Sequence, residues 1–179
     1  HGVQPDLVMV SGLCHQNEAR DWLLNLLSQP CENESINLAV VQALGCWGAE
    51  VPISVVINCL QHPGQLYRLA GLQLLSFRSH CIEDDELLQL CHHLLNDFRD
   101  LVVVETIRVL QRRDGVVISE ALADLCQNGS NAVAEAALRA LGCIATTASQ
   151  RCLLELSQNL DDENRRLLAS KQLSQQFRQ

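Results

Sequence analysis

A leucine recurs at nearly constant spacing along the chain, and this periodicity limits the fold more than any other feature of the sequence. Leu13, Leu44, Leu75, Leu110 and Leu141 follow one another in steps of 31, 31, 35 and 31 residues. Each leucine ends an apolar run with helical spacing, and the residue two positions before it is polar in every copy. A fixed period of this length is typical of proteins built from stacked structural repeats.

The copy NAVAEAALRALG, residues 131–142, shows most clearly that these runs are helices. Asn128, Ser130 and Asn131 offer side-chain oxygens that could cap its first turn. Glu135 lies four residues before Arg139, the favoured order for an ion pair on a helix surface. An apolar stripe on the other side comprises Ala132, Val133, Ala136, Ala137, Ala140 and Leu141. We therefore predict an amphipathic helix whose stripe is buried.

Each copy also contains a second, shorter amphipathic run, and turn-forming residues such as His62-Pro63-Gly64 separate the copies. The sequence thus predicts an all-α chain in which every repeat is a helical hairpin. The extra residues of the 35-residue step fall around Arg78 to Asp85, where we expect a longer loop. We place the repeats at 5–29, 34–62, 65–96, 100–127 and 131–158, with a terminal helix at 163–177, in a single domain covering 1–179.

The segments SINLAVVQALG, LYRLAGLQLLS and NAVAEAALRALG resemble the HEAT repeat in its short, phycobilin-lyase-like form. This resemblance implies a right-handed α-solenoid, an armadillo-like superhelix of about five HEAT-like helical hairpins. The family often places an arginine early in the first helix, paired with an aspartate of the turn. Arg68 and either Arg165 or Arg166 match that arginine, whereas three copies depart from it; these carry Asn37, Val103 and Ala134.

The charge of the chain bears on its partners. The formal net charge is −8, and the single lysine is Lys171. Nucleic acids and anionic membranes attract clustered positive charge, so we expect neither nucleic-acid binding nor direct membrane insertion. The repeat register together with the absence of catalytic motifs favours a non-catalytic scaffold or adaptor that binds another protein. The resemblance leaves one alternative open, a phycobilin-lyase-like enzyme or a cofactor-delivery chaperone.

The resemblance implies that the second helices line the concave face of the solenoid, so their outward residues are our candidate binding surface. One column of outward residues reads Asn25, Asn58, His93, Asp124 and Glu155, and another, one turn earlier, reads Asp21, Ser54, Gln89, Glu120 and Arg151. Residues four apart share a helix face, so the two columns form one polar surface. We expect it to bind a basic helix or extended segment; the alternative is an ordinary solvated face.

Metal and nucleophile chemistry find little support in the sequence. Nine cysteines at irregular spacing do not form a disulfide framework, and most lie in apolar runs, so we expect core thiols in a reducing compartment. The chain has no CxxC, HxxxH or His-Glu pair, and Cys91-His92-His93 cannot converge on one metal from a helix. We therefore expect no metal, no cofactor and no catalytic residue. We expect Trp22 to pack in the core or as part of an end cap, and Trp47, Tyr67 and Phe98 to pack under loops.

The ends of the sequence lead us to further expectations about the first helix, the length of the whole protein and its location. The first helix, near residues 5–14, is rich in leucine and valine, which predicts a truncated internal repeat or a dimer surface. The chain starts with His-Gly rather than methionine, so we expect a piece of a longer protein. No run of 18 apolar residues and no signal peptide is visible, so we expect a cytoplasmic location, alone or as the cytosolic part of a larger or membrane-anchored protein.

Overall fold

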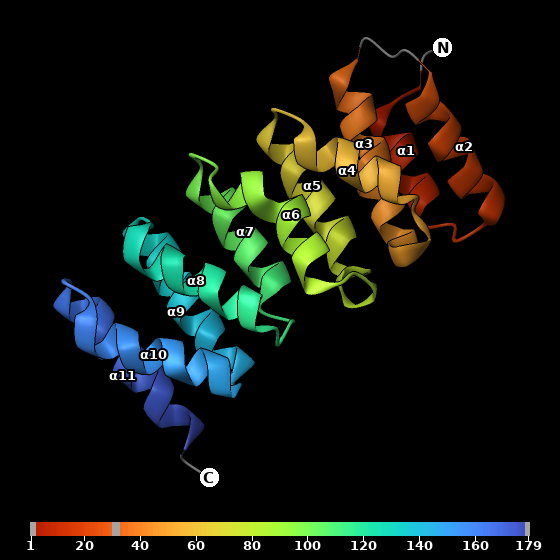
Figure 1. Ribbon diagram of the computed structural model, residues 1–179. Coiled ribbons are helices and arrows are strands. Elements are labelled where there is room, and N and C mark those ends of the chain that lie inside the picture. The colour runs from red at the N-terminus through yellow and green to blue at the C-terminus, as the bar shows by residue number, and fades with distance from the viewer. Residues whose placement is uncertain (1–2, 30–32, 178–179) are drawn as a thin grey trace. The chain divides into compact units, whose positions relative to one another are not determined.

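The computed structural model describes residues 3–29 and 33–177, which form eleven α-helices and two short 3-10 helices (Figure 1). The α-helices are α1 (Pro5–Gly12), α2 (Asn17–Ser28), α3 (Glu34–Leu44), α4 (Ile53–Gln61), α5 (Gln65–Ser76), α6 (Asp84–Leu95), α7 (Asp100–Leu110), α8 (Val116–Asn128), α9 (Asn131–Ile144), α10 (Thr147–Asn159) and α11 (Glu163–Gln176). The 3-10 helices are η1 (Gly45–Glu50) and η2 (Ser79–Cys81). The expectation of an all-α fold is thus confirmed, and each proposed repeat holds two α-helices.

Several helices begin where the sequence offers a capping side chain. Ser130 is the N-cap of α9, and its Oγ accepts a hydrogen bond from the Val133 amide at 3.3 Å. Asn33, Thr146 and Asp162 cap α3, α10 and α11 in the same manner. A cap of this kind satisfies a backbone N–H that the helix itself leaves without a partner. The predicted cap of α9 is therefore confirmed for Ser130.

The recurring leucines lie in the core. Leu44, Leu75, Leu110 and Leu141 have no exposed surface, whereas Leu13, which follows α1, is 70% exposed. In α9 the predicted stripe is largely buried, but Ala132 is exposed, so its assignment to the stripe is wrong. Ala134 and Leu138 are fully buried instead. The buried arc of α9 is wider than a single stripe because neighbouring helices cover it from more than one direction, namely α7, α8, α10 and α11.

By its internal contacts the chain divides into two compact units, His1–Ser79 and His80–Gln179. The division falls in the proposed third repeat, where the expected longer loop contains η2. The placement of all repeats in one domain stays a prediction. Within the described residues, no helix combines the length and the apolar character needed to cross a bilayer.

In the first unit α3 is central, since it packs against α1, α2 and α5, while α4 and α5 form a hairpin. Gly71 brings the two helices of this hairpin close together. A Cβ atom at Gly71 would lie 2.8 Å from the Cβ of Cys59 and 3.1 Å from the backbone nitrogen of Leu60. The small residue thus lets α5 approach the backbone of α4.

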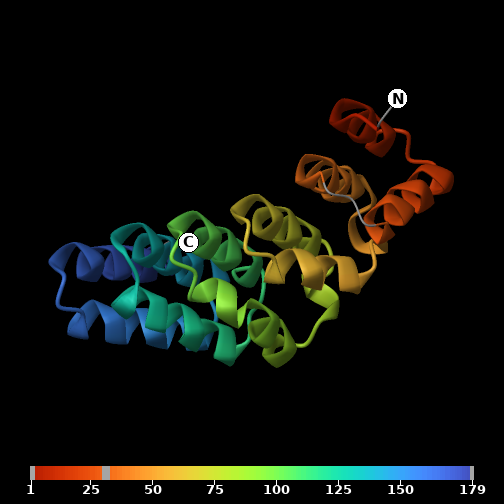
Figure 2. The same cartoon turned by 90° about the horizontal axis from the view of Figure 1, so that it is seen from above.

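The second unit consists of two layers of helices (Figure 2). One layer contains α7, α9 and α11, in which each helix packs on the next. The other contains α6, α8 and α10, packed in the same order, and α8–α9 and α10–α11 form close hairpins between the layers. This arrangement is consistent with a helical repeat and gives the second helices one common side.

Candidate functional site

All ten residues of the candidate binding surface are exposed, and each lies on the second helix of its proposed repeat. In the first unit Asp21 and Asn25 lie on α2, and Ser54 and Asn58 lie on α4. In the second unit Gln89 and His93 lie on α6, Glu120 and Asp124 on α8, and Arg151 and Glu155 on α10. Exposure is necessary for binding, but an ordinary solvated face would have it too, so the role of these residues stays a prediction.

In the second unit the side chains of this surface meet across helices. An Arg151 guanidinium nitrogen on α10 lies 3.9 Å from a carboxylate oxygen of Glu120 on α8 and 3.9 Å from one of Glu155, one turn further along α10. Glu120 and Arg151 are consecutive members of one predicted column. All three side chains are about 60% exposed, so these long contacts add little stability.

Negative charge in the second unit is concentrated on the layer of second helices. Together α6, α8 and α10 carry six carboxylates and one arginine, whereas α7, α9 and α11 carry four carboxylates, four arginines and a lysine. The six acidic side chains of these second helices are Asp84, Asp85, Glu86, Glu120, Asp124 and Glu155. One of them, Asp84, pairs with Arg113 at 2.7 Å. The others leave a negative potential on this side of the unit.

The corresponding helices of the first unit are nearly neutral. Arg20 on α2 pairs with its neighbour Asp21 at 3.2 Å and with Glu50 of η1 at 2.8 Å. The helix α4, with the sequence ISVVINCLQ, has no charged residue. The two units therefore present different chemistry on their second helices: uncharged polar groups around Asn58, and carboxylates around Glu120.

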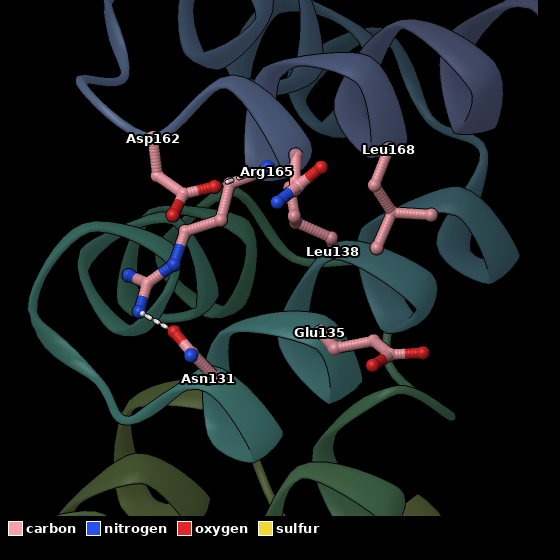
Figure 3. Close-up of a pocket in the computed structure, with 7 residues that line it drawn as sticks. Asn131, Glu135, Leu138, Asp162, Arg165 and Leu168 are labelled. Atoms are coloured by element: carbon pink, nitrogen blue, oxygen red, sulfur yellow. Dashed lines mark hydrogen bonds between the residues drawn. The ribbon is translucent and has the colours of Figure 1, made fainter.

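A pocket of about 190 Å³ lies between α9 and α11 in the second unit, and its polar groups serve the fold (Figure 3). Arg165 extends from α11 and donates to the backbone carbonyls of Cys126 and Gly129, both at 3.0 Å, and to Oδ1 of Asn131 at 2.9 Å. The Asp162 carboxylate accepts from the backbone amide of Arg165 at 2.9 Å. Arg165 thus ties α11 to the last turn of α8 and to the turn that follows, so we assign this pocket a structural role.

Other arginines also hold backbone turns. Arg78 donates to the carbonyls of Ala49 in η1 and of Val51 directly after it, and Arg68 donates through Nε to the carbonyl of His62 at 2.7 Å. Arg68 is one of the positions that resemble the HEAT-repeat arginine, and Arg165 is one of the two alternatives in the terminal helix; both bind carbonyls at the end of a preceding helix.

The buried thiols are poor nucleophiles near neutral pH. Burial raises the pKa of Cys59 to about 11 and the pKa values of Cys91 and Cys126 to about 12. Burial also raises the pKa of Cys152, and the nearby Glu155 carboxylate acts in the same direction. The expected core role is confirmed for these four cysteines but is wrong for Cys14, Cys46, Cys81 and Cys143, which are exposed. Cys31 lies outside the described residues.

The aromatic residues, like the cysteines, include both buried and exposed side chains. Trp47 is buried, whereas Phe98 is 88% exposed, so packing under a loop is wrong for Phe98. Trp22 is 37% exposed, so it does not lie in the core, and its packing in an end cap stays a prediction. The ring of Phe98 is covered on one side by the guanidinium of Arg99, whose central carbon lies 4.7 Å from the ring centroid.

His92 and His93, which the sequence offered as metal-ligand candidates, are exposed. In the described part of the chain no group of three or more His, Cys, Asp or Glu side chains is arranged to hold a metal ion.

A comparison with models of known protein families gives no match for this chain. A search of curated proteins gives no match either. The function proposed below therefore rests on the chemistry and arrangement of the residues.

Proposed function

We propose that this chain is a non-catalytic scaffold or adaptor, folded as a right-handed HEAT-like solenoid, whose second helices bind another protein. The observation that carries the proposal is the concentration of carboxylates on α6, α8 and α10, centred on Glu120, Asp124 and Glu155. A basic helix or extended segment is the partner that this charge favours, because complementary charge increases the rate of association and fixes the orientation of the complex.

The proposal is supported by the weak internal use of these carboxylates. Glu120 and Glu155 share Arg151 at 3.9 Å, and their side chains are 59% and 66% exposed. A guanidinium or ammonium group of a partner could replace Arg151 at little cost, since exposed pairs of this kind contribute at most about 1 kcal/mol.

The experiment selects binders from a displayed library of random peptides and measures their affinity for three proteins. These are the unchanged chain, the triple variant E120K/D124K/E155K, and a matched control E105K/E135K/E163K with the same change of net charge on the first helices. We expect the selected peptides to contain lysine or arginine and to bind the E120K/D124K/E155K variant about tenfold more weakly at low salt, with little loss for the control.

Two results would overturn the proposal. Equal losses for the two triple variants would mean that only net charge matters, and a larger loss for the control would move the binding surface to the first helices. The bilin-lyase-like alternative makes a separate prediction, namely that an open-chain tetrapyrrole changes its absorbance when mixed with the protein. Helical circular dichroism of all variants should equal that of the unchanged chain, because every substituted side chain is exposed or half-buried.

A further inference from the structure

A second pocket lies among the helices of the first unit, and its lining differs from that of the pocket beside Arg165. It has a volume of about 370 Å³ and opens between α2, α3 and α4, next to the start of α5. Its apolar wall includes Leu24 and Leu27 of α2, Val41 of α3 and Val55 of α4. Pockets of this volume with an apolar wall commonly accept a small ligand or a side chain.

The pocket occupies the place where two successive second helices would otherwise meet. In the second unit α8 packs closely against α10, whereas in the described part of the first unit α2 and α4 make far less contact. Leu24 and Leu27 on α2 and Val55 on α4 therefore line an open space between the two helices. Apolar side chains that border such a space gain from an apolar group that displaces water.

Two polar groups of this pocket are uncharged amides without internal partners, beside Ser28, His62 and Tyr67 in the same lining. Asn37 of α3 and Asn58 of α4 both line the pocket. Across the described residues, neither side-chain amide makes a hydrogen bond within the chain. Each carboxamide offers one acceptor and two donors, which matches the C=O and N–H groups of a peptide backbone. Among the described residues that line the pocket there is no acid, lysine or arginine, so this lining favours a neutral group.

The rim continues into a neighbouring hollow, so the site is longer than one residue. His62 and Tyr67 border the pocket and also line an adjacent hollow of about 280 Å³, whose lining includes Leu38, Leu66 and one acid, Glu34. Their rings stack with centroids 3.9 Å apart, and His62 Nδ1 accepts the Gly64 amide at 3.0 Å. In neutral His62 the proton is therefore on Nε2, which adds a donor at the rim. An extended segment fits two adjoining hollows better than a compact molecule does.

We propose that this pocket binds a neutral, extended peptide segment of the protein partner, with one large apolar side chain inside it and the peptide backbone on Asn37 and Asn58. The inference rests on the proposed function, because Asn58 belongs to the candidate binding surface. It adds a specific anchor to that function: the first unit recognises an apolar residue, while the second unit recognises basic ones.

The test uses blocked amino acids as probes and nuclear magnetic resonance of the full chain. We expect N-acetyl-leucine-N-methylamide and N-acetyl-phenylalanine-N-methylamide to shift the side-chain amide signals of Asn37 and Asn58 in a saturable manner, with Kd values of about 1–10 mM. The alanine, aspartate and lysine analogues should bind at least about fivefold more weakly. Toluene, which has no amide, distinguishes a peptide site from a plain hydrocarbon cavity. The proposal is overturned if toluene binds as well as the phenylalanine probe, if the alanine analogue matches the leucine probe, or if no saturable shift occurs.

Two variants keep the test independent of a folding failure. V55F fills the pocket, and N58A removes one amide from an exposed position, so each should weaken binding of the leucine probe by about fivefold or more. Q61A, which changes an exposed polar side chain at the end of α4 outside the pocket lining and outside the candidate surface, is the matched control and should leave binding unchanged. Normal binding by N58A would overturn the role of that amide even if V55F misfolds.

The probes also separate this inference from the proposed function. The E120K/D124K/E155K variant should bind the leucine probe normally, because its changes lie in the second unit. If selected basic peptides bind but the probes do not, the pocket inference is wrong and the scaffold proposal stands. If the probes bind but no basic peptide does, the acidic surface is wrong and the first unit has its own ligand.

Discussion

Glu120 on α8 and Arg151 on α10 approach each other to 3.9 Å, although 31 residues separate them in the sequence. That separation equals the period of the repeated leucines. The contact shows that equivalent positions of successive second helices are neighbours in this part of the molecule. It also places a positive group among the carboxylates of the candidate surface, where a basic partner would have to compete with it.

Removal of Arg151 should therefore strengthen the binding of basic peptides. We expect R151A to bind a lysine-containing selected peptide about threefold more tightly at low salt, since one competing charge is lost. The stability of the chain should change by less than about 0.5 kcal/mol, because the side chain is 63% exposed. Fluorescence anisotropy measures the affinity, and R108A, on the exposed side of α7, is the control. Weaker binding to R151A would mean that the arginine itself contacts the partner.

Arg165 should be important for the stability of the second unit. R165A removes the hydrogen bonds to the carbonyls of Cys126 and Gly129 and to Asn131, and it leaves carbonyls at the end of α8 without a partner. We expect a loss of about 2 kcal/mol in the free energy of unfolding, measured by urea denaturation. R166A changes the adjacent arginine, which is also half-buried, and should cost less than about 0.5 kcal/mol. Equal losses would show that Arg165 has no special role.

Gly71 should not tolerate a side chain, because a Cβ atom there would lie 2.8 Å from Cys59 Cβ. G71A should destabilise the first unit by about 1–3 kcal/mol in thermal or urea unfolding, as expected for overpacking of a helix interface. G45A is the control, since a Cβ at Gly45 meets only the Gln73 side chain at 3.7 Å and its backbone is right-handed helical. A neutral G71A would mean that α4 and α5 are not in close contact.

The buried thiols predict a loss of stability at alkaline pH. The pKa of Cys91 is raised from 9.0 to about 12 in the native chain, so above pH 9 the unfolded chain releases a proton that the folded chain retains. The Cys91 thiol therefore makes its full contribution to the free energy of unfolding below pH 9, and this contribution is lost as the pH rises towards 12. Between pH 10 and 11 each such thiol steepens the decline by about 1.4 kcal/mol per pH unit.

The C91A variant should lack one such contribution, so its free energy of unfolding should fall less steeply across this range than that of the unchanged chain. The comparison concerns slopes, because C91A also creates a small cavity that lowers stability at every pH. C143A is the control: its side chain is exposed, and its removal should change the slope by much less. An unchanged slope for C91A would mean that the Cys91 thiol is accessible to solvent.

The sequence predicted the helices well because its signals are local. The leucine period located the first helices of the proposed repeats, Ser130 indicated the start of α9, and Glu135 with Arg139 indicated an ion pair that the structure has at 2.6 Å. The alignment of equivalent residues on successive second helices could be predicted too, since it follows from the period of the repeated leucines. These features depend on residues within one turn or one repeat, where spacing and capping chemistry determine geometry.

The features that the sequence analysis missed depend on tertiary contacts. The exposure of Phe98, the role of Arg165 as a link between α11 and the end of α8, and the opening between α2 and α4 all require tertiary contacts. A pattern of apolar residues shows that Leu24 and Val55 avoid water, but it does not show whether a neighbouring helix fills the space between them. The pocket at Asn37 and Asn58 could therefore not be predicted from the sequence.

The most direct test of the central proposal is the footprint of a selected basic peptide on the full chain. Backbone amide signals are followed by nuclear magnetic resonance while the peptide is added to saturation. The proposal predicts the largest shifts at Glu120, Asp124 and Glu155, with small changes on the exposed sides of α7 and α9. A footprint centred on Arg108 and Arg139 would contradict it, because the partner would then bind the first helices.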